Sequence, residues 1–92
     1  MKLTIIVDDN AVYKNTVSFS PVDLSTAPSS VHALQFDTTT NTGHIEFKDA
    51  PNQVITTLPD WAVTASSNYD TALAAYQAYR AANPVVYQVS GG

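Results

Sequence analysis

The 92-residue sequence contains no cysteine, which excludes disulfide cross-links, thiolate zinc sites and cysteine nucleophiles. It has only three glycines and lacks the spaced glycine motifs that cradle phosphate groups. The longest apolar run near the N-terminus covers residues 5–7, against roughly 7–15 apolar residues in a signal-peptide core and about 20 in a membrane span. We therefore expect a soluble, unexported chain that is held together by packing alone.

Charge is also scarce. Charged residues make up 13% of the chain, against roughly 25% in typical soluble domains, and the net charge is −4. The basic residues are scattered singly along the chain: Lys2, Lys14, Lys48 and Arg80. Because binding to a nucleic-acid backbone needs clustered positive charge, we expect no nucleic-acid partner. A surface made polar by Thr, Ser, Asn and Gln instead suits packing into an assembly.

No pattern of reactive side chains indicates catalysis. His32 and His44 lie in one predicted hairpin, but a metal or acid–base site needs further donors of defined geometry, and the spacing supplies none. Asp8 and Asp9 resemble the start of a calcium loop, yet the glycine and glutamate that such a loop needs are missing. No serine lies in a Gly-x-Ser-x-Gly motif. We predict a non-enzymatic protein without a cofactor or a bound metal.

The first part of the chain has the pattern of short β-strands. Residues 3–7 are rich in β-branched side chains and are followed by turn-forming residues. Residues 11–19 alternate as one further strand, which Asn15 could interrupt, and the result is an antiparallel meander. Residues 20–30 are rich in proline and serine and predict a connecting loop.

A β-hairpin is the clearest local prediction. Two alternating segments within residues 31–47 flank a polar turn that ends in Gly43. The side chains predicted to face inward are Leu34, Phe36, Ile45 and Phe47. After a turn, residues 53–58 are expected to form a short final strand.

From Pro59 onward the apolar period becomes helical. The repeating positions are Ala62, Ala65, Tyr69, Ala72, Tyr76 and Tyr79. The helical segment ends at the Asn83–Pro84 stop signal and is one helix or two. Any break is expected just before Asp70, because the preceding Ser and Asn residues are weak helix formers, so residues 71–82 are the safest helical segment.

The predicted fold is α+β: a small antiparallel meander of about four to five short strands, then an amphipathic helix and a tail strand. The β-rich body covers residues 1–58, the helical segment of the same domain covers residues 59–83, and the tail covers residues 84–92. Residues 85–89 alternate as a strand that pairs either with the domain's own sheet or with that of a partner.

Aromatic residues of the C-terminal third are the candidate contact residues. Tyrosine is favoured where one end of the ring stays wet, as at interfaces, although packing of these rings against the sheet is the alternative. The predicted protein-interface residues are Trp61, Tyr69, Tyr76, Tyr79 and Tyr87.

Several sequence blocks resemble a set of small proteins from tailed bacteriophage genomes. In order, the blocks are KLTIIVDD (residues 2–9), VDLS (22–25), VHALQF (31–36), GHIEF (43–47), PNQVIT (51–56) and LPDWA (58–62). The resemblance covers roughly two thirds of the chain, residues 2–62, and leaves out the helix and tail. This chain has Phe36 where the family pattern has tryptophan and Gln53 where it has glutamate.

The resemblance implies a bacteriophage virion protein, made in the host cytoplasm and built into the tail fibre or baseplate region. Its partners would be other phage structural proteins of the fibre, baseplate or capsid, in a homo- or hetero-oligomer. No catalytic residues come with this family. Three alternatives stay open: a tail-fibre assembly chaperone that is absent from the mature particle, a capsid decoration protein, and a small host-directed inhibitor or enzyme.

Overall fold

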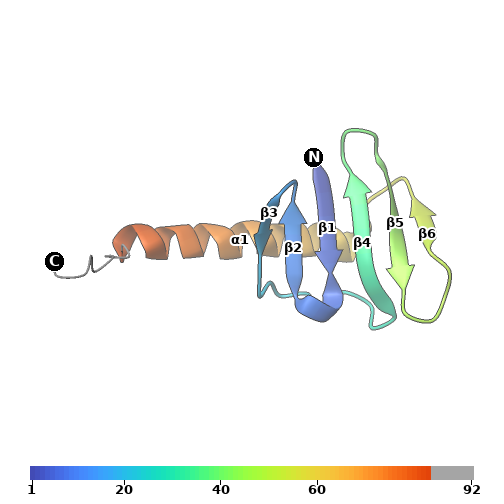
Figure 1. Cartoon of the computed structure of the whole chain (residues 1–92), viewed down its shortest axis with the longest axis horizontal. Helices are drawn as coiled ribbons and strands as arrows, with labels where there is room; N and C mark the ends of the chain where they lie inside the picture. Colours follow the sequence, from blue (N-terminus) through green and yellow to red (C-terminus); the bar gives the residue numbers. More distant parts are fainter. Residues whose placement is uncertain (84–92) are drawn as a thin grey trace, which may run out of the picture.

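The computed structural model describes residues 1–83, which form one antiparallel sheet and one long helix (Figure 1). The elements are β1 (Lys2–Ile6), the 3₁₀ turn η1 (Val7–Asp9), β2 (Ala11–Lys14), β3 (Val17–Phe19), β4 (Val31–Asp37), β5 (Thr42–Phe47), β6 (Gln53–Ile55) and α1 (Asp60–Ala82). The strand order is β3-β2-β1-β4-β5-β6, and every neighbouring pair is antiparallel. The α+β prediction of an antiparallel sheet followed by a helix is confirmed, with two three-stranded meanders joined by the pairing of β1 with β4. The predicted tail strand, residues 85–89, lies outside the described residues.

Residues 11–19 form two strands, β2 and β3, and the single strand predicted there is wrong. Asn15 adopts a left-handed backbone conformation (φ 55°), which reverses the chain between Lys14 and Val17. Its backbone N–H donates to the carbonyl oxygen of Lys2 at 2.8 Å, and its Oδ1 accepts from the backbone N–H of Lys2 at 3.0 Å. Within residues 1–83 the sheet therefore has six strands rather than four to five.

One face of the sheet carries the core. Leu34 stands at its centre, fully buried, between Ile5 on β1 and Ile45 on β5. The inward set predicted for the hairpin is confirmed: Leu34, Phe36 and Ile45 are buried, and Phe47 is partly buried against them. Alternation in β4 is shifted by a bulge between Val31 and Ala33, where the register with β5 changes.

The connection between β3 and β4 contributes to the core. Val22 and Leu24 are 3% and 5% exposed, so this loop packs against the sheet. It is held there by the backbone N–H of Val22, which donates to the carbonyl oxygen of Asn10 at 2.7 Å. The expectation of a simple connector missed these two core residues.

Helix α1 is continuous from Asp60 to Ala82, with Pro59 just before it, and has no break before Asp70. Ala62, Ala65 and Tyr69 of its first half are buried against the sheet. The apolar area buried on both sides of Ser66–Asn68 outweighs the few tenths of a kcal/mol per residue by which these side chains disfavour a helix.

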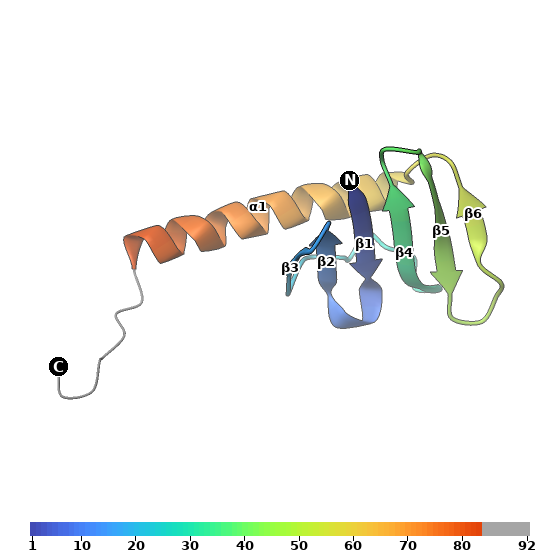
Figure 2. The ribbon, with the colours of Figure 1, turned by 45° about the horizontal axis from the view of Figure 1, so that its top comes forward.

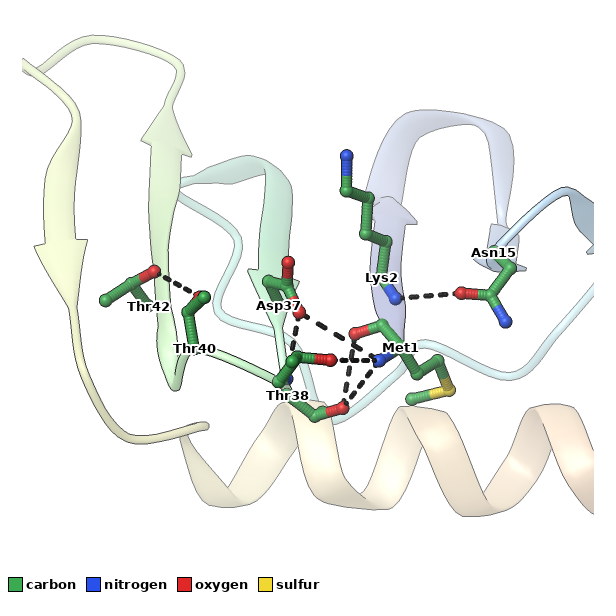
Figure 3. A network of polar contacts seen from close by, with 8 residues as sticks. Met1, Lys2, Asn15, Asp37, Thr38, Thr40 and Thr42 are labelled. Atoms are coloured by element: carbon green, nitrogen blue, oxygen red, sulfur yellow. Dashed lines mark hydrogen bonds and ion pairs between the residues drawn. The ribbon is translucent and has the colours of Figure 1, made fainter.

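A polar network joins the start of β1 to the end of β4, the two central strands of the sheet (Figure 3). The ammonium group of Met1 donates to Thr38 Oγ1 at 3.0 Å and lies 3.9 Å from Asp37 Oδ1. The backbone N–H of Thr38 donates to the carbonyl oxygen of Met1 at 2.8 Å. Asp37 Oδ1 also accepts from the backbone N–H of Thr39 at 2.8 Å, and this bond is the main reason that the pKa of Asp37 lies below its ordinary value of 3.8.

Replacing Asp37 by asparagine is expected to make the stability of the fold less dependent on pH in the acid range. Because the folded-state pKa is lowered, the carboxylate stabilises the fold above the unfolded-state pKa, and this contribution disappears as the pH falls through the folded-state pKa. Urea midpoints measured between pH 6 and pH 2 should therefore fall less steeply for Asp37→Asn than for the wild type. Equal slopes for Asp37→Asn and wild type would contradict the assignment.

Candidate protein-interaction surface

The surface begins where helix α1 passes beyond the sheet. Figures 1 and 2 show that the first half of α1 crosses one face of the sheet and that its C-terminal half projects past β3. The helix has 23 residues, so it is about 35 Å long at 1.5 Å per residue. All side chains from Ala74 to Asn83 are exposed, which makes this half a bare projection from a packed base.

Tyr69 marks the point at which the helix leaves the sheet. Its side chain is 3% exposed, and its hydroxyl donates to the carbonyl oxygen of Val17 on β3 at 2.9 Å. Burial, with a smaller effect of Asp70, raises its pKa above 10.0. Lys14 Nζ lies 2.8 Å from Asp70 Oδ1 and 5.3 Å from the centre of the Tyr69 ring. These contacts fix the helix to β2 and β3 at one place.

Beyond Tyr69, the stripe of the helix that faces the sheet passes over β3 and then extends past this last strand of the described residues. Tyr76 is 44% exposed, and one side of its ring packs on Phe19 with 5.5 Å between the ring centroids. Arg80 Nη1 donates to the hydroxyl of Tyr76 at 2.9 Å, with the guanidinium carbon 5.8 Å from the ring centre. Tyr79, one turn further, is 62% exposed. We call Leu73, Tyr76 and Tyr79 the helix shelf.

Strand β3 lies beside the helix shelf and is an edge of the sheet. Val17 is 52% exposed, and a hollow opens between the end of β3 and the helix. The residues that line this hollow are Ser18, Phe19, Ser20, Pro21 and Tyr76. The helix shelf, an open hollow and the edge strand β3 are therefore adjacent.

The structure separates the five predicted interface residues. Tyr76 and Tyr79 are exposed on the helix shelf, whereas Tyr69 is inside the core and Trp61 is half-buried against it. Tyr87 lies outside the described residues. A single strand over residues 11–19, as the alternation predicts, contains no edge strand β3, so this part of the surface is not evident from the sequence pattern. The preference of Asn15 for the left-handed region is the signal that indicates it.

The opposite face of the sheet is polar. One row of paired residues crosses all six strands: Ser18, Tyr13, Thr4, Gln35, His44 and Val54. His44 Nε2 lies 3.3 Å from Glu46 Oε2, while His32 Nδ1 lies 2.7 Å from Asp8 Oδ2, so the two histidines have separate carboxylate partners. In the described part of the chain no three His, Asp or Glu side chains converge as metal ligands.

No helix within residues 1–83 is long and apolar enough to cross a membrane. No family model, curated protein or solved structure matches this chain at a significant level.

Proposed function

We propose that this chain is a non-enzymatic structural protein of a tailed bacteriophage particle, located in the tail fibre or baseplate region and acting through protein–protein packing. The helix shelf is the observation that carries the packing role. The sequence blocks that resemble small phage proteins supply the phage context.

Covering the helix shelf with a partner would be energetically favourable. A tyrosine ring buries roughly 150–250 Å² when covered, and exposed aromatic side chains that stand together are typical of interaction sites. Tyr76 and Tyr79 expose about half of their surface although they continue the stripe whose Tyr69, two turns before Tyr76, is part of the core. A partner that covers them gains apolar burial, and both hydroxyl groups stay at the wet rim of the contact.

The rest of the domain gives this surface a rigid base. Ala62 and Ala65 have no exposed surface and hold the first half of the helix against the sheet, while Tyr69 joins it to β3. Because few rotatable groups must be ordered on binding, most of the gain from burying the two rings would appear as affinity. The sheet would hold α1 in a fixed position, and the projecting half of the helix would contact the partner.

Quantitative mass spectrometry of purified particles of the encoding phage tests this proposal. We expect this chain at a fixed copy number relative to the tail-tube and major capsid proteins, at the same ratio in independent preparations. A chain that is made during infection but missing from purified particles would contradict the structural role. It would favour the alternative of a tail-fibre assembly chaperone that is absent from the mature particle. A ratio that falls with each purification step would contradict it as well.

A further inference from the structure

The outer edge of β3 lies open to strand addition in the part of the chain that the structure describes. Edge strands are normally protected by charged side chains, prolines or bulges, because an unpaired row of N–H and C=O groups invites another strand. Strand β3 (Val17–Phe19) has no charged side chain, proline or bulge, and its three-residue length is the one feature that limits pairing along this edge. Val17 on this strand is half exposed, so the edge offers apolar side-chain surface as well as backbone groups.

The helix shelf covers one face of the space beside this edge. Strands in a sheet are about 4.8 Å apart, and the helix from Tyr76, which still contacts β3, to Ala82 spans about 9 Å along its axis. The projecting part of α1 therefore covers the width of about two additional strands. The contact of Tyr76 with Phe19 and the hollow at Ser18–Pro21 lie where the first added strand would begin.

The chain itself contains a segment whose pattern fits this place. Val85, Tyr87 and Val89 alternate with Val86 and Gln88, which is the pattern of a half-buried strand. In a strand added to β3, the side chains of Val85, Tyr87 and Val89 would face the helix shelf. The other two would extend the opposite face, where the paired row across the sheet is mostly polar.

The geometry disfavours pairing of Val85 with the β3 edge of the same chain. Tyr76, which contacts β3, precedes Asn83 by seven residues, or about 10 Å along the axis, and an added strand would lie about 5 Å beyond β3 in the same direction, which leaves Asn83 about 5 Å past it. The layers of helix and sheet add roughly 10 Å in the perpendicular direction. Pro84 is the single connector before Val85, and the two peptide steps from Asn83 to Val85 span at most about 7 Å.

We propose that residues 85–89 of one copy of this chain add as a strand to the β3 edge of a second copy, under the second copy's helix shelf. This inference deepens the proposed function, on which it rests, by naming the partner of the same surface. The half-exposed tyrosines of two copies offer roughly 400 Å², well below the 1,000 Å² or more of a stable interface. The strand pairing supplies the missing area and backbone hydrogen bonds.

Mixed disulfide formation between two singly substituted full-length chains tests the pairing, because the native chain has no cysteine. One chain carries Ser18→Cys, at an exposed position of β3 that faces away from the helix, and the other carries Gln88→Cys or, to cover a shift of register by two, Val86→Cys. Oxidation of the equimolar mixture should give the mixed dimer in about tenfold or greater excess over either homodimer, as expected for sites held at high effective concentration. Val54→Cys, exposed on the other edge strand β6, serves as the matched control and should give no such excess.

Equal yields of the mixed dimer from the Ser18→Cys and Val54→Cys chains would overturn the proposal. In a chain that carries both Ser18→Cys and Gln88→Cys, a disulfide formed within one chain rather than between two chains would overturn it as well. Light scattering on the unsubstituted chain provides a readout that does not depend on any substitution: a molar mass of at least two copies is expected, and a monomer at all concentrations would overturn the pairing. These outcomes concern the isolated chain. Particle stoichiometry is measured separately, so failure of the virion role and failure of the strand addition are distinguishable.

Discussion

Replacement of Leu34 by alanine lowers the free energy of unfolding by an expected 2–5 kcal/mol, with the exact loss set by how far the cavity collapses. Leu34 has no exposed surface and lies at the centre of the six-stranded sheet between Ile5 and Ile45. A domain of this size has a total stability of about 5–15 kcal/mol, so the substitution removes a large part of it. Urea unfolding followed by circular dichroism measures the change.

The matched control for this substitution is Val54→Ala on β6, where the side chain is 77% exposed. Its expected effect is within about 0.5 kcal/mol, because the side chain touches little and its removal leaves no cavity. If Leu34→Ala costs no more than Val54→Ala, the core is not centred on β4 and the arrangement of the sheet is wrong.

Simultaneous replacement of Tyr76 and Tyr79 by serine is expected to weaken self-association by about 100-fold, which corresponds to about 2.8 kcal/mol. The unfolding free energy should fall by only about 1–2 kcal/mol, because the contact with Phe19 is lost while the core beneath Tyr69 stays intact. Sedimentation over a range of concentrations gives the first quantity, and urea unfolding of the same samples gives the second.

Tyr13→Ser separates this effect from a general effect of removing tyrosine. The exposed fraction of Tyr13 is 39%, similar to the 44% of Tyr76, but Tyr13 lies on the opposite face of the sheet. Its replacement should leave association unchanged. Unchanged association of the Tyr76/Tyr79 variant would contradict the interface, and so would complete unfolding, since that would make these rings part of the core.

The β part of the fold was predictable where alternation and turn residues agree. The hairpin of β4 and β5 is such a place: apolar alternation on both strands predicted its inward side chains, and Gly43 sits where a Cβ would come within 2.1 Å of the carbonyl oxygen of Gln35. The hairpin of β2 and β3 was missed, because the alternation runs unbroken through residues 11–19 and the reversal depends on a single left-handed Asn15. Local pattern does not reveal such a reversal, since the bonds that hold Asn15 come from Lys2 on another strand.

The helix shows why the candidate surface was only partly predictable. Its sequence predicted a single stripe from Ala62 to Tyr79, but periodicity does not tell where the sheet beneath a helix ends. Tyr69 and Tyr76 occupy equivalent positions on that stripe, yet Tyr69 is buried and Tyr76 is half exposed. Tyr76 packs on Phe19 of β3, the last strand on this side within residues 1–83, and no further strand covers the rest of its ring. The separation of core from surface therefore depends on the width of the sheet, which is set by strand pairings far apart in the sequence.

The most direct test of the structural role is immunogold labelling of intact particles of the encoding phage with an antibody against the folded body of this chain. We expect gold at the tail fibre or baseplate in a constant number per particle. Gold on the capsid shell, or no labelling of particles that contain complete tails, would contradict the proposed place and role of this protein.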